Sequence, residues 1–370
     1  MLSVTRLTGS AWIRGRQTLP VTIHCWLAPG EGESALRTAL QPECAQVAER
    51  KRTPPQRQHG AAWDPVDYPV AGRVLCYYSC SSRSVIMQSR ASQTAVRVAL
   101  QRAVHQVLDA EPRVLIDPIA VGLFPEATEV AIRADATRHL EPGWCRIRAN
   151  FVLRSRHTED CLSEAVKRGI EQYVILGAGL DTFAYRQPGW ARDLRIVEVD
   201  QPASQAFKVQ CLKAAGITVP ENLNFLPVDF RAETLIEKLW TTPLSKSKPN
   251  FVSWIGVTQY LDSEAIGTTL RAVASWPGGS ELVLEYIESD WTSLDTVARK
   301  AMEDAVARAT AAGEPWLSRF SGNAMINLLR KSGFSEVRHL SLGDARDRYF
   351  RDRSDGLTPA GGIAMLWARS

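Results

Sequence analysis

The sequence predicts an α/β fold in which a mostly parallel sheet carries helices on both faces. From residue 173 onward, short apolar segments alternate with segments of helical periodicity, a pattern typical of parallel sheets. The first apolar run, Tyr173 to Leu176, enters a turn that contains Gly177 and Gly179. A second apolar strand follows at 194–199, and acidic residues stand at its end.

Helices are expected before the first strand. Apolar residues recur at helical spacing between Ala91 and Leu108, and Asp117-Pro118 ends the pattern because the residue before a proline disfavours helix. Residues 121–143 mix short helical signals with loops. Ala149 to Lys167 is predicted to be one long helix that leads into the first strand, at 173–177.

After the glycine turn, the spacing of apolar residues again favours a helix. The later strands are expected at 194–199, 223–228, 250–255 and 280–287. The helices between them are expected at 202–215, 231–240 and 262–275. The remaining elements are a helical insertion at 290–312, a helix at 324–331 closed by Gly333, and strands at 335–342 and 362–368.

Composition and charge exclude several classes of protein. The apolar share of 45% is ordinary for a globular protein. No apolar run approaches the roughly 18 residues of a membrane-spanning helix. Residues 1–86 hold ten Lys and Arg against six Asp and Glu, and the remaining residues are balanced. A nucleic-acid platform needs a concentrated basic face, so we expect neither nucleic acid nor membrane as a partner.

Residues 1–86 are expected to be an extension outside the main domain. They show no sustained helical or strand period and contain Pro54-Pro55. The pair Cys76 and Cys80 lacks the further Cys or His residues of a metal site, so we expect no metal and unligated thiols. Without a secretory signal, the protein is expected to be cytoplasmic. The extension is either poorly ordered, or Met87 is the physiological start.

The glycine turn and the acids after the next strand suit a nucleotide-like cofactor. Gly177 and Gly179 leave no Cβ in the way of a ligand, and a carboxylate there can accept two hydrogen bonds from a ribose diol. Sites for a nicotinamide dinucleotide normally have Gly or Ala at the position of Thr182, and Asp181 would repel the pyrophosphate of that cofactor. S-adenosylmethionine (SAM), which has a sulfonium and no phosphate, fits this turn better.

Six blocks of sequence carry a resemblance to a known family: Gln172 to Arg186, Glu198 to Lys208, Ser92 to Ala95, Asp117 to Ala120, Val228 to Phe230, and Gly256 to Leu261. Together they resemble the class I SAM-dependent methyltransferases of the leucine carboxyl methyltransferase-like group, most closely its bacterial branch. The likeness extends from about Ser89 to Ser370.

This resemblance implies a seven-stranded, mostly parallel Rossmann-like sheet whose final pair inserts antiparallel, with helices on both faces and a helical cap. It implies four parts: a helical part 87–168, a SAM-binding core 169–287, a helical insertion 288–320 and C-terminal strands 335–370. The implied activity is SAM-dependent methyl transfer to an oxygen of a small molecule, either a carboxylate or a hydroxyl.

The resemblance also implies which residues hold SAM. Arg154 on the long helix would bind the donor's carboxylate, because a guanidinium matches two oxygens. Asp200 is the favoured ribose ligand and Glu198 the second, and strand alternation puts both on one side. The other expected contacts are Gly177 and Gly179 under the methionine part, Asp181 at the ammonium or as a helix cap, and Asp229 and Phe230 at the adenine.

One position departs from the family pattern. The related carboxyl methyltransferases have Glu where Ile255 stands, so an acidic contact is missing. Trp254 and Ile255 either pack near the cofactor or fill the core, and Tyr260 either faces the transfer site or is structural. No Ser-His-Asp or Cys-His arrangement has supporting context, so the sequence names no general base.

The insertion offers Trp291, Trp316 and Phe320 as a substrate lid, although core packing explains them almost as well. Two other functions stay open: a nicotinamide-dependent oxidoreductase, and a SAM-binding protein without catalysis. The acceptor and the oligomeric state cannot be read from the residues.

Overall fold

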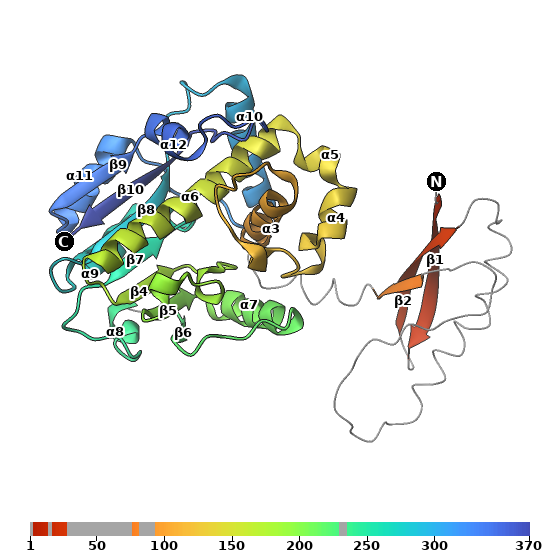
Figure 1. Ribbon diagram of the computed structural model, residues 1–370, viewed down its shortest axis with the longest axis horizontal. Helices are drawn as coiled ribbons and strands as arrows, with labels where there is room; N and C mark the ends of the chain where they lie inside the picture. The colour runs from red at the N-terminus through yellow and green to blue at the C-terminus, as the bar shows by residue number, and fades with distance from the viewer. Residues whose placement is uncertain (1–2, 14–16, 28–75, 81–92, 229–234) are drawn as a thin grey trace, which may run out of the picture. The chain divides into compact units, whose positions relative to one another are not determined.

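Figure 1 shows the computed structural model, which describes residues 3–13, 17–27, 76–80, 93–228 and 235–370. The chain divides into two compact units, Met1–Arg90 and Ala91–Ser370. Each unit is considered by itself.

The first unit contains strands that the sequence pattern does not reveal. β1 (Ser3–Ile13) pairs antiparallel with β2 (Gln17–Leu27), and β2 pairs antiparallel with β3 (Cys76–Cys80). Their Thr, Val, Ile and Trp residues favour extended backbone, but the apolar and polar positions do not alternate cleanly. The role of residues 1–86 as an extension outside the main domain stays a prediction.

The second unit is built on the predicted seven-stranded sheet, in the order β6-β5-β4-β7-β8-β10-β9. The strands are β4 (Gln172–Leu176), β5 (Arg195–Asp200), β6 (Leu223–Pro227), β7 (Phe251–Trp254), β8 (Glu281–Ile287), β9 (Glu336–Leu340) and β10 (Ile363–Arg369). The neighbouring strands β6, β5, β4, β7 and β8 run parallel to one another, and β10 runs antiparallel between β8 and β9. This confirms the expected fold class.

Helices cover both faces of this sheet (Figure 1). They are α3 (Gln93–Leu108), α4 (Glu129–Ala134), α5 (Ala136–His139), α6 (Pro142–Lys167), α7 (Pro202–Ala214), α8 (Leu235–Leu239), α9 (Ser263–Ala274), α10 (Thr296–Ala311), α11 (Gly322–Ser332) and α12 (Leu342–Tyr349). As predicted, α11 ends at Gly333, whose φ of 113° is left-handed. In the described ranges, no helix combines the length and apolarity that a bilayer crossing would require.

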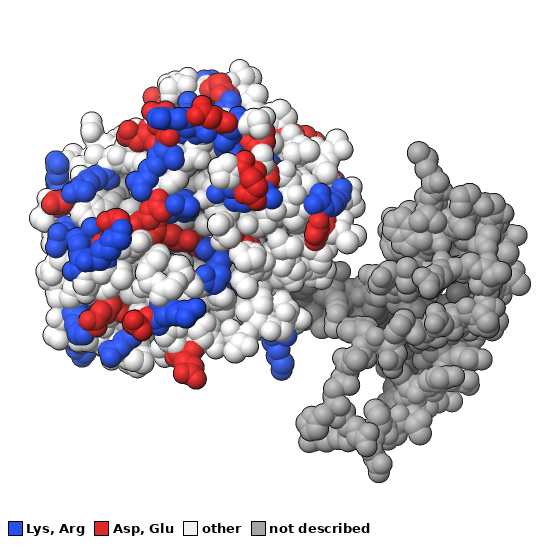
Figure 2. All heavy atoms as spheres, viewed as in Figure 1, with Lys and Arg blue, Asp and Glu red and all other residues white. Residues whose placement is uncertain are grey.

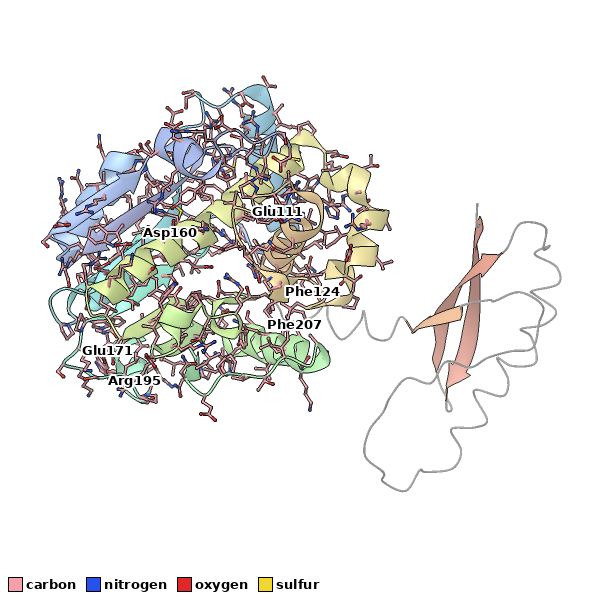
Figure 3. The ribbon with its side chains drawn as sticks, in the orientation of Figure 1. Glu111, Phe124, Asp160, Glu171, Arg195 and Phe207 are labelled. Carbon is pink, nitrogen blue, oxygen red and sulfur yellow. The ribbon has the colours of Figure 1, made fainter. Side chains whose placement is uncertain are left out.

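The core explains why strand β4 is buried along its whole length. Val174 and Leu176 pack in a cluster with α9 and α11, whereas Tyr173 and Ile175 pack in a second cluster with α6. Successive side chains of a strand point to opposite faces, so a sheet covered on both sides selects apolar residues at every position. A third cluster joins α3 to α7, and it includes Phe124 and Phe207 (Figure 3).

Three local expectations were wrong. The crossover from β4 to β5 holds only the short 3-10 turns Phe183–Tyr185 and Gly189–Ala191, not the expected helix. α6 begins at Pro142 rather than near 149, because proline suits the first helical turn. An unpredicted helix, α12, lies between the last two strands.

On the face seen in Figure 2, acidic and basic side chains are interspersed over the second unit.

Candidate active site

A cavity of about 470 Å³ lies at the carboxyl ends of β4, β5, β7 and β8. This edge of a parallel sheet is where ligands usually bind in α/β proteins. Helices α3 and α6 and the segment 313–317 after α10 complete its walls. Among the predicted site residues, the cavity brings together Arg154, Gly177, Gly179, Asp181, Asp200 and Tyr260.

The glycine turn forms the floor of the cavity, and both glycines are required by the backbone. Gly177 has φ +70°, and a Cβ there would lie 2.2 Å from Cγ2 of Val257. Gly179 has φ +47°, and its Cβ would lie 3.3 Å from Cβ of Ala95 on α3. The turn therefore fits closely between two neighbouring elements only because side chains are absent.

Asp200 is held in place by backbone groups. Its Oδ2 accepts a hydrogen bond from the Gly179 N–H at 2.5 Å, and its Oδ1 accepts one from the Gln201 N–H at 2.7 Å. Burial raises the pKa of this carboxyl above its ordinary value, although both hydrogen bonds oppose that shift. Asp200 thus presents a fixed acceptor beside the glycine turn.

Glu198, the second ribose candidate, is absent from the cavity lining. Its Oε2 lies 2.6 Å from Nζ of Lys208, and both side chains are at most 2% exposed. The ammonium of Lys208 also lies 5.3 Å from the ring centre of Tyr185. Burial raises the pKa of Glu198 to about 7. The structure therefore gives Glu198 a buried ion pair beneath the site rather than a position facing a ligand.

Asp181 lines the cavity and also stabilises the turn. Its Oδ1 accepts a hydrogen bond from the N–H of Phe183 at 2.8 Å. This contact is an Asx turn ahead of the 3-10 turn Phe183–Tyr185, whose N-cap residue is Thr182, so Asp181 is not the helix N-cap that the sequence left open as an alternative.

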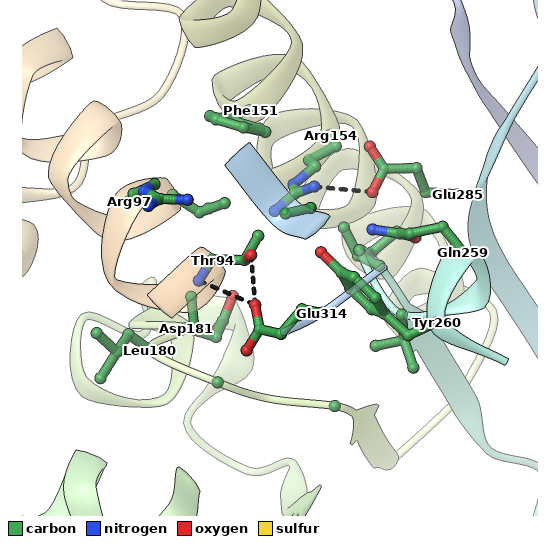
Figure 4. Close-up of a pocket in the computed structure, with 18 of the residues that line it drawn as sticks. Thr94, Arg97, Phe151, Arg154, Leu180, Asp181, Gln259, Tyr260, Glu285 and Glu314 are labelled. Carbon is green, nitrogen blue, oxygen red and sulfur yellow. Dashed lines mark hydrogen bonds and ion pairs between the residues drawn. The ribbon is translucent and has the colours of Figure 1, made fainter. Parts of the chain in front are cut away.

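Arg154 reaches the cavity from α6 and is already paired. Its Nη1 donates a hydrogen bond to Oε2 of Glu285 at 2.8 Å, and its guanidinium lies 4.8 Å from the ring centre of Phe151 (Figure 4). Gly256, with φ +72°, makes room for it, because a Cβ there would lie 3.1 Å from Nη1. The turn after β7 thus fixes the position of Arg154.

Glu285 is a site residue that sequence reasoning missed. It is 2% exposed, lines the cavity, and its Oε1 has no hydrogen-bond partner among the described residues. Burial raises the pKa of its carboxyl, while Arg154 and the backbone N–H of Gly256 oppose that shift. The β7–β8 register places Trp254 beside Leu284, so Glu285 follows at the level of Ile255. An acid inside the apolar run 281–287 was the available signal.

Asp117 belongs to one of the sequence blocks that resemble the family, and this block lies outside the sheet. It is fully buried and binds Nε of Arg102 on α3 at 2.9 Å and Oγ1 of Thr182 at 2.7 Å. Arg102 in turn donates a hydrogen bond to the carbonyl of Leu180. These contacts join α3 to the glycine turn, and we expect them to hold the floor of the cavity in place.

Sequence comparison identifies the family of this chain. Residues 95–274 match the model of the leucine carboxyl methyltransferase family. A relative from Bacillus subtilis (strain 168), named "Putative S-adenosyl-L-methionine-dependent methyltransferase YktD", is 37% identical over 209 residues, which are 56% of this chain and 68% of the relative. The chain belongs to the leucine carboxyl methyltransferase family. It is a SAM-dependent methyltransferase of the bacterial branch.

A second sequence relative agrees with this assignment. A protein of Mycobacterium sp. (strain JLS) with the same general name is 30% identical over 220 residues, covering 56% of this chain and 69% of that protein. The structure of a methyltransferase from Thermobifida fusca YX, described as putative, aligns with a TM-score of 0.47 at 16% identity, covering 78% of this chain and 97% of that one. The strand order of the methyltransferase is itself that of class I enzymes.

The remaining predicted residues of the methyltransferase divide between wall and core. Tyr260 and Ile255 line the cavity, and the buried hydroxyl of Tyr260 has no partner among the described residues. Trp254 is fully buried and fills the core. Of the three lid candidates, Trp316 lines the cavity, whereas Trp291 and Phe320 pack in hydrophobic clusters.

Asp229 and Phe230, the expected adenine contacts, lie outside the described residues. In the part of the chain that the structure describes, no group of three or more His, Cys, Asp or Glu is arranged to hold a metal ion.

The donor's chemistry fits the residues that are present. The two glycines leave a floor that side chains would obstruct, and Asp200 offers carboxylate oxygens to a ribose. Arg154 and the unpartnered Oε1 of Glu285 offer opposite charges side by side. SAM has a diol and a zwitterionic methionine end, which match these groups.

Proposed function

We propose that this methyltransferase transfers a methyl group from SAM to an oxygen of a small organic molecule, a carboxylate or a hydroxyl. The observation that carries the proposal is one cavity of about 470 Å³ with a mixed lining. The lining combines the glycine turn, Arg154 and Asp200 with aromatic side chains. This volume is typical of small-molecule sites, so a macromolecular acceptor is disfavoured.

We propose that the donor is held at three points. Asp200 accepts the ribose hydroxyls, Arg154 binds the carboxylate of the methionine end, and Oε1 of Glu285 accepts a hydrogen bond from its ammonium. Glu285 would thereby supply the acid that the family has at the position of Ile255. Support comes from the side-by-side placement of Arg154 and Glu285, and from the orphaned oxygen of Glu285. Asp229 and Phe230 stay predicted adenine contacts.

SAM, when bound, would supply an electrophilic methyl group to the acceptor oxygen and would leave as S-adenosylhomocysteine. The chain's residues position the two partners and exclude water. The hydroxyl of Tyr260 is a candidate to orient the acceptor, since it is buried and unpartnered among the described residues. A carboxylate acceptor needs no base, whereas a hydroxyl acceptor must lose a proton.

Calorimetric titration with SAM, S-adenosylhomocysteine and NADH tests the donor. We expect the first two to bind and NADH not to bind. Tight NADH binding alone would instead indicate the nicotinamide oxidoreductase. Labelled SAM incubated with the enzyme and a metabolite extract should yield a labelled product, and failure to label any compound would favour a SAM-binding protein without catalysis.

A further inference from the structure

Two arginines face the cavity from helices that are far apart in sequence. Arg97 on α3 and Arg308 on α10 both line it, and Nη1 of Arg97 donates a hydrogen bond to the Arg308 carbonyl at 3.4 Å. In Figure 4, Arg97 reaches inward from the side opposite Glu285. The guanidinium of Arg308 lies 4.7 Å from the ring centre of Trp144, within the range of a cation–π interaction.

These two positive charges lack ion-pair partners among the described residues. Of the nearby acids, Asp304 pairs with Lys300 and Asp135 with Arg138, while Glu314 accepts a hydrogen bond from the Thr94 hydroxyl. Burial lowers the pKa of Arg308, the charge of Asp304 opposes that shift, and Arg97 and Arg138 add to it. Guanidiniums that have no ion-pair partner keep their N–H donors available to bind an anion.

The cavity that these arginines line also has aromatic side chains and unpartnered hydrogen-bond donors. Trp144, Phe151, Tyr260 and Trp316 line the cavity together with them. The indole N–H of Trp316 and the hydroxyl of Tyr260 are buried without partners among the described residues. Flat apolar faces bind a planar ring, and unpaired donors bind the oxygens of an anion.

We infer that the acceptor is a small organic anion with a planar apolar body, whose negative group binds Arg97 and Arg308 beside Trp144. This inference rests on the proposed function and narrows its substrate class. The arginine pair makes a charge-dependent subsite, distinct from the donor contacts of Arg154 and Glu285. Arg97 and Arg308 would therefore determine which acceptors bind, while leaving donor affinity unchanged.

Calorimetry on the full chain saturated with S-adenosylhomocysteine tests the inference. The probes are 1-naphthoate and indole-3-acetate, compared with their amides, which keep the shape and lose the charge. We expect the acids to bind at least about tenfold more tightly than the amides. Equal binding of acids and amides, or no binding of either acid, would overturn the inference.

Substitutions locate the subsite. The double variant Arg97→Gln with Arg308→Gln should bind the acids at least about tenfold more weakly, and Arg97→Lys with Arg308→Lys should retain part of the affinity. Arg319→Gln is the matched control, because Arg319 also stacks on a tryptophan, Trp291, but lies outside the cavity lining. Unchanged binding of the acids to the double glutamine variant would contradict the assignment.

Donor binding separates this inference from the proposed function. All three variants should bind S-adenosylhomocysteine as the wild type does, which also shows that they fold. If the wild type itself fails to bind S-adenosylhomocysteine, the proposed function fails. Intact donor binding combined with charge-independent acceptor binding rejects only the anion subsite.

Discussion

Asp200 and Glu198 lie two residues apart on one side of β5, yet their surroundings differ. Asp200 stands at the end of the strand, where two backbone N–H groups orient it beside the cavity. Glu198 is one pleat deeper and is neutralised by Lys208 in the interior. A carboxylate therefore faces the cavity at one position and forms a buried ion pair at the other.

Substitution of each acid should separate these effects. Asp200→Asn should weaken S-adenosylhomocysteine binding by about tenfold or more, because a charge-assisted hydrogen bond to the ribose is lost. Glu198→Gln should leave donor affinity nearly unchanged but lower the free energy of unfolding by roughly 3 kcal/mol, because Lys208 loses its buried partner. Calorimetry and urea denaturation measure the two quantities. Equal donor affinity of wild type and Asp200→Asn would reject the ribose contact.

His157 on α6 gives a prediction for pH. Burial lowers its pKa from 6.5 to about 4, and its Nδ1 lies 3.1 Å from the hydroxyl of Tyr349. Between these pH values the unfolded chain binds a proton that the folded chain excludes. The free energy of unfolding should therefore fall by up to about 3 kcal/mol as pH decreases from 6.5 to 4.

Urea denaturation across this pH range measures the effect of His157. The variant His157→Gln should show a flatter pH dependence than the wild type. His339→Gln, at an exposed position on β9, is the control. A wild-type slope retained in His157→Gln would show that other groups cause the loss of stability.

At the scale of elements, we expect the turn after β7 to position Arg154. Substitutions of two glycines test this expectation. Gly256→Ala introduces a Cβ 3.1 Å from Arg154 Nη1, at φ +72°. Gly216→Ala is a matched control, since φ is +69° and nothing lies within 4 Å of its Cβ. Each variant should lose about 1 kcal/mol of stability from the left-handed backbone. Only Gly256→Ala should weaken donor binding as well, and equal affinities would contradict the positioning role.

The central strands β4, β7 and β8 were predictable because their apolar runs follow directly from burial on both faces of the sheet. The crossover from β4 to β5 was not. Leu180 and Phe183 have helical spacing, but Leu180 packs with the α3 cluster and Phe183 with the α6 cluster. Their apolar character comes from two separate tertiary contacts, and Pro188 and Gly189 then disfavour a continuous helix.

The candidate site was predictable only where a local motif marks it. The glycine turn and Asp200 belong to one strand–turn–strand unit, so their spacing identifies them. Arg97, Glu285 and Arg308 come together only when distant segments fold against one another. The sequence did not reveal that Glu198 lies outside the cavity lining, because strand alternation gives the face of a side chain but not its depth.

At the scale of the molecule, the division at residue 90 predicts that the second unit is self-sufficient. A chain beginning at Met87 should bind S-adenosylhomocysteine with the affinity of the full chain, because the described cavity residues all lie in the second unit. Calorimetry and thermal denaturation of both chains make the comparison. A clear loss of affinity in the shorter chain would assign a functional role to residues 1–86.

The ion pair of Arg154 and Glu285 also bears on the response to ionic strength. The methionine end of SAM carries one carboxylate and one ammonium, so its binding between Arg154 and Glu285 adds no net charge to the pair. The affinity for this end group should therefore change little with salt concentration. An anion that binds Arg97 and Arg308 is held by electrostatic attraction to the two guanidiniums. Counterions screen this attraction over about 3 Å at 1 M salt. As the salt concentration rises, the cavity should therefore keep its affinity for the zwitterionic donor and lose affinity for the anionic acceptor.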